Sequence, residues 1–438
     1  MKFSMFNIWA IVNNRIIIFN TLTQALASFD QKHVGDIEIA LTSSDVSRIP
    51  KEFVEDMFED GYLVKENQDE LGAVEEAVTD RRSRRDEHSL CVMLNKVCNF
   101  DCSYCFQLHN GRILSKSGIN RITNLFQNIL LTARKIELDW FGGEPLLSFA
   151  KLRELNELFF ALAEEKKVPY SFSITTNGYL LNTEVLSYLR KRRPTQLTIT
   201  LDGPPDVHDK SRPLKNGQGT FWVILENVKQ AIASGLEITL RVNISKDNVG
   251  RVPELFDILV LQGLKNWVRV NLQPVVSSEA HPCEEGCLTG YSSAHSILSI
   301  YLEQVKKGWK SFPLLENLRV LGFCIGEYPN RIVTDLDCRI YCCTQMAEGE
   351  AIGEINESGQ VVENFSEMSR WVAKNPLDFP ECRVCSILPI CMGGCNMKRA
   401  LKNQMDYCLD WKHDLPTLLE ILVLSAEDPT LSSLTGSS

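Results

Sequence analysis

The sequence lacks any long apolar run. No stretch of its 438 residues approaches the ~20 consecutive apolar residues that a membrane-spanning helix needs. At its N-terminus it also lacks the basic segment, apolar core and small-residue cleavage site of an export signal. We therefore expect no membrane partner and a cytoplasmic protein, in which cysteine thiols stay reduced.

The sequence also lacks an excess of basic residues. Its 46 Lys and Arg are outnumbered by 56 Asp and Glu, which gives a net charge of −10. A nucleic-acid-binding surface needs clustered positive charge to neutralise phosphates. The basic run at residues 81–85 is followed by Asp86 and Glu87, so we interpret it as a solvated linker. Nucleic acid is therefore not an expected partner.

Cysteine, by contrast, is abundant. The chain has 15 cysteines, many at short spacings, and such clusters in a reducing compartment are typical of metal or iron–sulfur ligands. The hydrophobic content of 44% and charged content of 23% fit a globular enzyme. The chain is too long for one ordinary core, so two or three domains are expected.

Three cysteines form a C-x3-C-x2-C motif at Cys98, Cys102 and Cys105. Three thiolates this close can wrap one corner of a [4Fe–4S] cluster but supply no fourth ligand. One iron then stays open, whereas electron-transfer clusters usually have four cysteines. The alternative is a zinc site, for which His109 is the best local fourth ligand.

Further polar motifs follow strand-like segments downstream. Two adjacent glycines let a backbone approach a ligand closely, and a proline ends a strand. Thr-Asn-Gly and Asp-Gly-Pro are strand-to-loop signals. The candidate residues are Gly142, Gly143, Glu144 and Pro145 after segment 136–140, Thr176 and Asn177 after 171–175, Asp202 after 197–201, and Arg241 within 237–244.

The cysteine motif, with Tyr104 before its last cysteine, and the order of these motifs resemble the radical S-adenosylmethionine (SAM) enzymes. The resemblance implies a [4Fe–4S] cluster on the three cysteines whose open iron chelates SAM. Reductive cleavage of SAM, fed by a donor such as flavodoxin or ferredoxin, then yields a 5′-deoxyadenosyl radical. The implied SAM-binding residues are Gly142, Gly143, Glu144, Pro145, Thr176, Asn177 and Arg241. The alternative for each polar residue, Arg241 above all, is a strand-end cap.

A second group of cysteines lies near the C-terminus and comprises Cys382, Cys385, Cys391, Cys395 and Cys408. A structural zinc site is the alternative. The spacing resembles the SPASM domain, which carries auxiliary [4Fe–4S] clusters in many radical SAM enzymes that modify peptides. The resemblance implies one cluster on Cys382, Cys385, Cys391 and Cys408, with Cys395 contributing to a second.

The upstream half of this pattern departs from the SPASM family. The family has a cysteine five residues after a glycine. In this chain the position five residues after Gly359 is occupied by Asn364 instead. The remaining candidates for a second auxiliary cluster are Cys338, Cys342 and Cys343. That cluster is complete, has an open iron or is missing. In relatives that form formylglycine, an aspartate base follows the missing cysteine; Phe365 stands there, which counts against that activity.

Strands that alternate with helices over residues 89–315 indicate parallel βαβ units. We predict an α/β fold whose core is a partial (β/α)6 TIM-like barrel, with the motifs gathered at the carboxyl ends of its strands. The predicted strands lie near 90–96, 136–140, 171–175, 197–201, 237–244 and 267–273, and the helices include 151–166, 222–234 and 253–262. Residues 316–425 form the cysteine-rich domain, with a final helix over 411–425, and residues 426–438 a disordered tail.

Residues 1–88 carry no cluster motif and are predicted to form a small α+β domain. It has a hairpin over 6–19 with an Asn13-Asn14 turn, helices over 22–29, 51–59 and 70–85, and a short strand at 61–64. The domain resembles the winged-helix module that binds the leader of a precursor peptide as an added β-strand. A packing cap or a divergent DNA-binding fold are the alternatives.

These features predict a radical SAM enzyme that abstracts hydrogen from a ribosomal precursor peptide and forms a thioether or C–C crosslink. One alternative is an anaerobic sulfatase-maturing enzyme, and another is a zinc-binding interaction protein. No acid/base catalyst is assigned, because structural roles are favoured for His208 and Asp209 on their motif loop.

Overall fold

The computed structural model describes residues 1–275, 286–288, 290–309, 330–346, 350–364, 375–395 and 408–426, with the single residues 318, 397 and 399. The chain divides into two compact units. One comprises residues 1–82, 289–324 and 374–438, and the other comprises residues 83–288 and 325–373. We call them the N/C unit and the sheet unit and describe each by itself.

The sheet unit is built on a ten-stranded sheet with the order β11-β10-β9-β8-β7-β6-β12-β13-β14-β15. The six strands from β6 to β11 pair in parallel with their neighbours, which confirms the predicted partial barrel. Their bounds are β6 (Glu87–Met93), β7 (Lys135–Phe141), β8 (Tyr170–Thr176), β9 (Gln196–Thr200), β10 (Ile238–Ile244) and β11 (Val268–Pro274).

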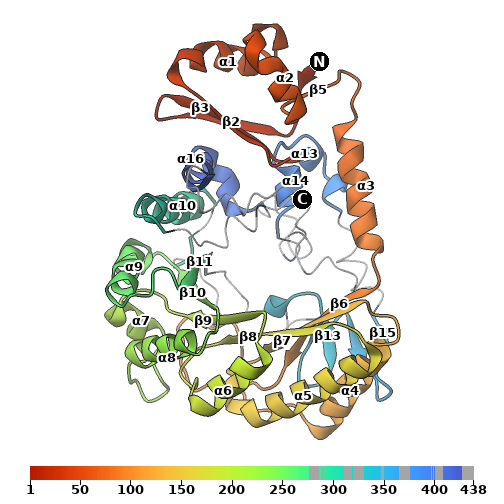
Figure 1. The fold of residues 1–438 in the computed structure, drawn as a ribbon. Helices are drawn as coiled ribbons and strands as arrows, with labels where there is room; N and C mark the ends of the chain where they lie inside the picture. The colour runs from red at the N-terminus through yellow and green to blue at the C-terminus, as the bar shows by residue number, and fades with distance from the viewer. Residues whose placement is uncertain are drawn as a thin grey trace. The chain divides into compact units, whose positions relative to one another are not determined.

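Helices connect these strands and carry apolar residues toward the sheet. Helix α4 illustrates the pattern, since its buried residues Ile122, Phe126 and Ile129 recur at the spacing of one helix face. Figure 1 shows α4, α5, α6 and α8 on one side of the sheet. The helices are α4 (Lys116–Ile129), α5 (Phe149–Lys166), α6 (Thr183–Arg192), α7 (Pro205–Ser211), α8 (Phe221–Ala233) and α9 (Val252–Leu261).

Four short strands extend the sheet beyond β6. Strand β12 (Arg331–Thr334) pairs in parallel with β6, and β13 (Arg339–Tyr341), β14 (Gly353–Ile355) and β15 (Val361–Glu363) continue it antiparallel. All four lie after residue 315, where we placed the end of the barrel domain. Strands of three or four residues leave too few positions for a periodic signal, so the sequence did not reveal this extension.

The N/C unit begins with the antiparallel sheet β2-β3-β4. Strands β2 (Asn7–Val12) and β3 (Arg15–Asn20) form the predicted hairpin, and the turn residues Asn13 and Asn14 have φ values of 52° and 60°. The predicted helix over 22–29 is wrong, because Leu26–Phe29 forms strand β4 beside β3. Pairing with β3 outweighs the helix propensity of this short Leu/Ala segment.

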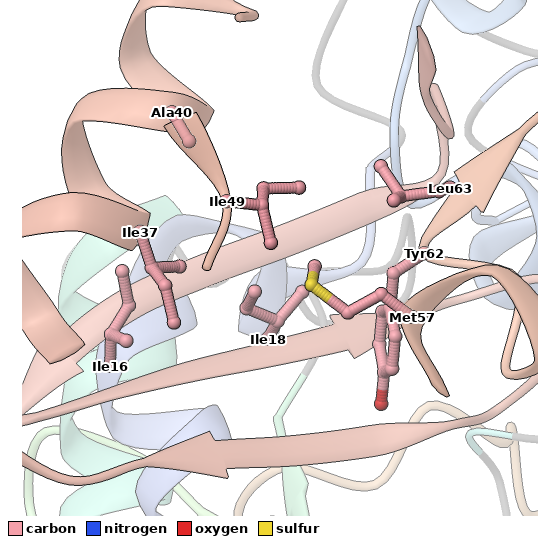
Figure 2. Close-up of a cluster of buried hydrophobic side chains, with 8 residues drawn as sticks. All are labelled: Ile16, Ile18, Ile37, Ala40, Ile49, Met57, Tyr62 and Leu63. Atoms are coloured by element: carbon pink, nitrogen blue, oxygen red, sulfur yellow. The ribbon is translucent and has the colours of Figure 1, made fainter. Parts of the chain in front are cut away.

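Helices cover one face of this small sheet. Figure 2 shows Ile16 and Ile18 of β3 facing residues of the helical layer, and Tyr62 lies at the edge of the same cluster. Three predicted elements are confirmed: helices α2 (Lys51–Glu59) and α3 (Glu70–Ser83) and strand β5 (Leu63–Val64). Strand β5 pairs with β1 (Lys2–Phe3). Helix α1 (Gln31–Ser43) was not predicted. The full cluster is Ile16, Ile18, Ile37, Ala40, Ile49, Met57, Tyr62 and Leu63.

A second core in the same unit joins the two ends of the chain. It contains Phe6, Val74 and Val78 from the N-terminal region together with Leu377, Cys382, Leu388 and Met392 from the cysteine-rich region. Helix α16 (Leu415–Ala426) also packs against β2 and β3, and against α10 (Gly290–Lys306), where Lys306 and Glu420 form a 2.8 Å ion pair. The N-terminal region therefore shares its core with the C-terminal cysteines.

Within the described ranges, no helix combines the length and the hydrophobicity needed to cross a membrane. The predicted C-terminal tail lies outside the described residues after Ala426, and so does Phe365.

Candidate cluster and cofactor site

The Gly-Gly-Glu-Pro turn after β7 lies against the segment that leads into the cysteine motif. Gly143 N donates to Asn95 O at 3.0 Å, and Glu144 N donates to Val97 O at 2.8 Å. A Cβ added to Gly143 would lie 2.2 Å from Val97 O, and one added to Gly142, at φ 137°, would lie 2.5 Å from Asn95 O. Only glycine allows this approach, which brings the turn beside the loop of Cys98.

The buried carboxylate of Glu144 joins this turn to the Thr-Asn-Gly segment at the end of β8. It accepts hydrogen bonds from Leu146 N at 2.9 Å, Thr176 Oγ1 at 2.7 Å and Asn177 N at 2.7 Å. Burial raises the pKa of Glu144, and these hydrogen bonds oppose that rise by favouring the anion. Asn177 Nδ2 in turn donates to Asn99 Oδ1 at 2.8 Å, beside Cys98.

The three cysteines of the motif occupy one loop after β6. Cys98 is buried, while Cys102 and Cys105 are partly exposed. Burial raises the pKa of Cys98 to about 11 and that of Cys102 to about 12. His109 Nε2, the ligand that a zinc site would require, lies 3.8 Å from Cys105 Sγ.

Tyr104, inside the cysteine loop, is held by the ends of β9 and β10. Its hydroxyl donates to Asp202 and accepts from Asn243 Nδ2 at 3.0 Å and Arg212 Nη1 at 2.6 Å. Arg241 Nε donates to Asn243 Oδ1 at 2.8 Å, which places this predicted SAM-binding residue in the same network. The carboxyl ends of β7, β8, β9 and β10 thus all connect to the cysteine loop.

Several residues of this site were not singled out from the sequence. Asn95 lies just before the motif, and its Nδ2 donates to Glu144 O at 3.0 Å and Ser148 Oγ at 2.9 Å. Asn99 lies inside the motif, so proximity to Cys98 was an available signal. Arg212 left no such signal, because its partner Tyr104 is 108 residues away.

The C-terminal cysteines lie in the N/C unit and line one pocket. The walls of the pocket include Cys382, Cys385, Cys391 and Cys408, the four residues predicted to hold one auxiliary cluster. Lys412 also lines it, and its Nζ donates to Cys408 Sγ at 3.5 Å. Four thiols around one space fit a [4Fe–4S] cluster, since such clusters take four cysteine ligands.

Nowhere in the described part of the chain do three or more His, Cys, Asp or Glu side chains converge as ligands of a single metal ion. The four C-terminal cysteines line a pocket instead, as noted above. Cys395 belongs to the same unit but not to the pocket lining.

Cys338, Cys342 and Cys343 lie in the sheet unit, around strand β13. Cys338 precedes the strand, and its Sγ donates to Gly118 O of α4 at 3.7 Å. Cys342 follows the strand, so an extended chain at ~3.3 Å per residue separates it from Cys338 by roughly 13 Å. The structure therefore places Cys338 apart from the adjacent pair, and a second auxiliary cluster stays a prediction.

A parallel half-barrel with a three-cysteine loop at the carboxyl ends of its strands is the arrangement that the resemblance to the radical SAM enzymes predicts. Residues 92–259 match the family described as the radical SAM superfamily. In these enzymes a bound [4Fe–4S] cluster supplies the electron that cleaves SAM. Cys98, Cys102 and Cys105 would hold that cluster in this chain.

Several characterised proteins are similar in sequence. The chain is 22% identical over 324 residues to the serine-type anaerobic sulfatase-maturating enzyme of Klebsiella aerogenes, covering 70% of this chain and 79% of the relative. It is 24% identical over 332 residues to the cysteine-type enzyme of Clostridium novyi, covering 69% and 86%. It is 24% identical over 211 residues to the radical SAM cyclopropyl synthase TigE of Paramaledivibacter caminithermalis, covering 43% of each chain.

Two solved structures share the fold. The structure of anSMEcpe with bound AdoMet superposes with a TM-score of 0.61 at 17% identity, covering 79% of this chain and 98% of that one. Streptococcus suis SuiB bound to its precursor peptide SuiA superposes with a TM-score of 0.53 at 13% identity. The SuiB match covers 94% of this chain and 100% of SuiB.

The close approach of Gly143 to Val97 leads to a prediction. We expect Gly143→Ala to destabilise the sheet unit by ~1–3 kcal/mol, because the methyl group must displace backbone, and to weaken SAM binding at least tenfold. Thermal unfolding and equilibrium dialysis with labelled SAM measure the two effects. Gly250→Ala is the matched control, since no atom lies within 4 Å of its added Cβ; equal behaviour of the two variants would contradict the prediction.

Proposed function

We propose that this enzyme modifies a ribosomally made precursor peptide, abstracting hydrogen from it and forming a thioether or C–C crosslink. The observation that carries the proposal is the pocket lined by four cysteines in the same compact unit as the N-terminal β-sheet. An auxiliary cluster there would bind a substrate thiolate or accept an electron. An external donor such as flavodoxin or ferredoxin would supply the reducing electron.

The similarity to SuiB supports a peptide substrate. That structure contains a precursor peptide, and its match extends over 94% of this chain, whereas the match to anSMEcpe covers 79%. The chain is also similar in sequence to TigE, which its name describes as a radical SAM cyclopropyl synthase. Neither relative identifies the residue that is modified here.

The N-terminal sheet offers edges for a leader peptide. Among the described strands, β2 and β4 each pair only with β3, so each has a free edge. Such an edge can accept a peptide as an added strand through backbone hydrogen bonds. All four residues of β4 are half-buried, which suits a strand whose side chains receive a further partner.

The test is reaction with a candidate precursor, chosen from short reading frames with spaced cysteines beside this gene. Incubation with SAM and dithionite should give a peptide that has lost two hydrogens, located by tandem mass spectrometry. We expect a leaderless core peptide to react at least tenfold more slowly than the full precursor. SAM cleavage without any change in the precursors would contradict the proposal.

Sulfatase maturation is the second candidate function, because sulfatase-maturating enzymes are among the similar proteins. Against it stand Asn364 and Phe365, where formylglycine-forming relatives are expected to carry a cysteine and an aspartate. Conversion of a Cys-x-Pro-x-Arg peptide to formylglycine would establish this activity instead. The radical SAM match favours either enzyme over a zinc-binding interaction protein.

A further inference from the structure

Residues 211–215, which start at the last residue of helix α7, clamp the cysteine loop. An isolated antiparallel bridge pairs Phe100 with Leu214. Three backbone hydrogen bonds flank it: Ser103 N to Ser211 O at 3.1 Å, Asp101 N to Pro213 O at 2.9 Å, and Lys215 N to Asn99 O at 3.1 Å. The segment between Cys98 and Cys105 is therefore held along its length by a strand-like segment more than 100 residues further along the chain.

Arg212 lies at the centre of this clamp with its side chain buried, at 8% exposure. Its Nη1 donates to Tyr104 Oη at 2.6 Å, and its guanidinium lies 4.0 Å from Asp202. The guanidinium carbon lies 5.6 Å from the ring centre of Phe100 and 6.0 Å from that of Tyr104. Both aromatic rings belong to the cysteine loop, so the charge lies beside two residues of that loop.

These partners leave part of the Arg212 guanidinium without a hydrogen bond and without a carboxylate of its own. Among the residues that the structure describes, its buried Nε finds no hydrogen-bond partner. Asp202, its carboxylate neighbour, also accepts from Tyr104 and from Asn243 N at 2.8 Å, so its negative charge is shared.

We propose that Arg212 is a positioning residue that stabilises the reduced state of the cluster held by Cys98, Cys102 and Cys105. Reduction adds a negative charge, and a buried cation beside the loop favours the charged product in a medium of low dielectric. Removing the cation then makes the reduction potential more negative. The inference concerns the cluster alone and does not depend on which peptide is the substrate.

The test is a redox titration of reconstituted protein followed by electron paramagnetic resonance, in which added SAM identifies the signal of this cluster. For Arg212→Met we expect the reduced-to-oxidised ratio at a fixed potential to fall about tenfold, which is ~59 mV for a one-electron couple. Arg212→Lys, which keeps the charge, should stay within threefold of the wild type. Arg212→Met with full iron content and the wild-type potential would overturn the inference.

Arg331→Met is the matched control. Arg331 is also buried, has an unpartnered Nε and is paired with a carboxylate, Asp139, at 3.2 Å. Its removal should leave the potential unchanged, and an equal shift would show that any buried cation has this effect. If Arg212→Met takes up no cluster, cluster loading is compared in Arg212→Gln and Arg212→Lys. Loading of the lysine variant alone supports a role for the charge. Failure of both variants to load would show that Arg212 is only a structural part of the clamp and would overturn the inference.

Discussion

Replacement of Cys98, Cys102 and Cys105 by alanine should abolish SAM cleavage and remove about four irons per chain, the content of one [4Fe–4S] cluster. Cys91 in the preceding strand β6 cannot replace the lost ligands, because its side chain is buried. We expect 5′-deoxyadenosine formation to fall at least a thousandfold. Anaerobic reconstitution, iron and sulfide analysis, and chromatography of the nucleoside products measure these effects.

Cys91→Ala is the control for this experiment. Cys91 lies in the same unit, is 1% exposed, and precedes the motif by seven residues. Its replacement removes a buried thiol without touching the loop, so iron content and SAM cleavage should remain those of the wild type. Zinc in place of iron, or SAM cleavage that survives in the triple variant, would refute the cluster assignment.

The core of the sheet unit could be predicted because each strand carries its own signal. Strand β10 was expected at 237–244 and spans Ile238–Ile244, and helix α5 was expected at 151–166 and spans Phe149–Lys166. These elements are long enough for their hydrophobic periodicity to show in isolation. Segment 22–29 had no such advantage, since only its pairing with β3 makes part of it a strand.

The sequence motifs of the site could be predicted, but the hydrogen bonds that connect them could not. The three cysteines lie within one short segment, and Gly-Gly-Glu-Pro is a single run of four residues, so each pattern is visible locally. The contacts of Tyr104 with Asp202 and Arg212 bridge 98 and 108 residues, respectively. Such pairs depend on how the strands line up in the sheet, which local composition does not record.

The shared core of the N/C unit is a further feature that local patterns did not reveal. Phe6 begins the predicted hairpin and Val74 lies in the predicted helix over 70–85, whereas Cys382 is a predicted cluster ligand. The structure packs them together, so a residue predicted to bind a cluster also closes the core around the N-terminal segment. Loading of the C-terminal site should therefore stabilise the N-terminal module that we propose to bind the leader.

The C-terminal cysteines give the second large expected effect. Cys385→Ala/Cys408→Ala should remove about four irons and reduce peptide modification at least a hundredfold, while SAM cleavage stays within threefold of the wild type. These two cysteines are chosen because both are partly exposed, whereas Cys382 is buried in the core shared with Phe6. Iron analysis, nucleoside chromatography and mass spectrometry of the peptide separate the three readouts.

Cys395→Ala completes this design, because Cys395 lies in the same unit but outside the pocket lining. Retention of all iron in this variant would mean that Cys395 holds no second auxiliary cluster, and a loss of iron would mean that it does. In either case the pocket irons should remain. Unchanged iron or unimpaired peptide modification in Cys385→Ala/Cys408→Ala would show that the pocket is not a cluster site. Because the radical-forming site lies in the other unit, its SAM cleavage distinguishes that outcome from general misfolding.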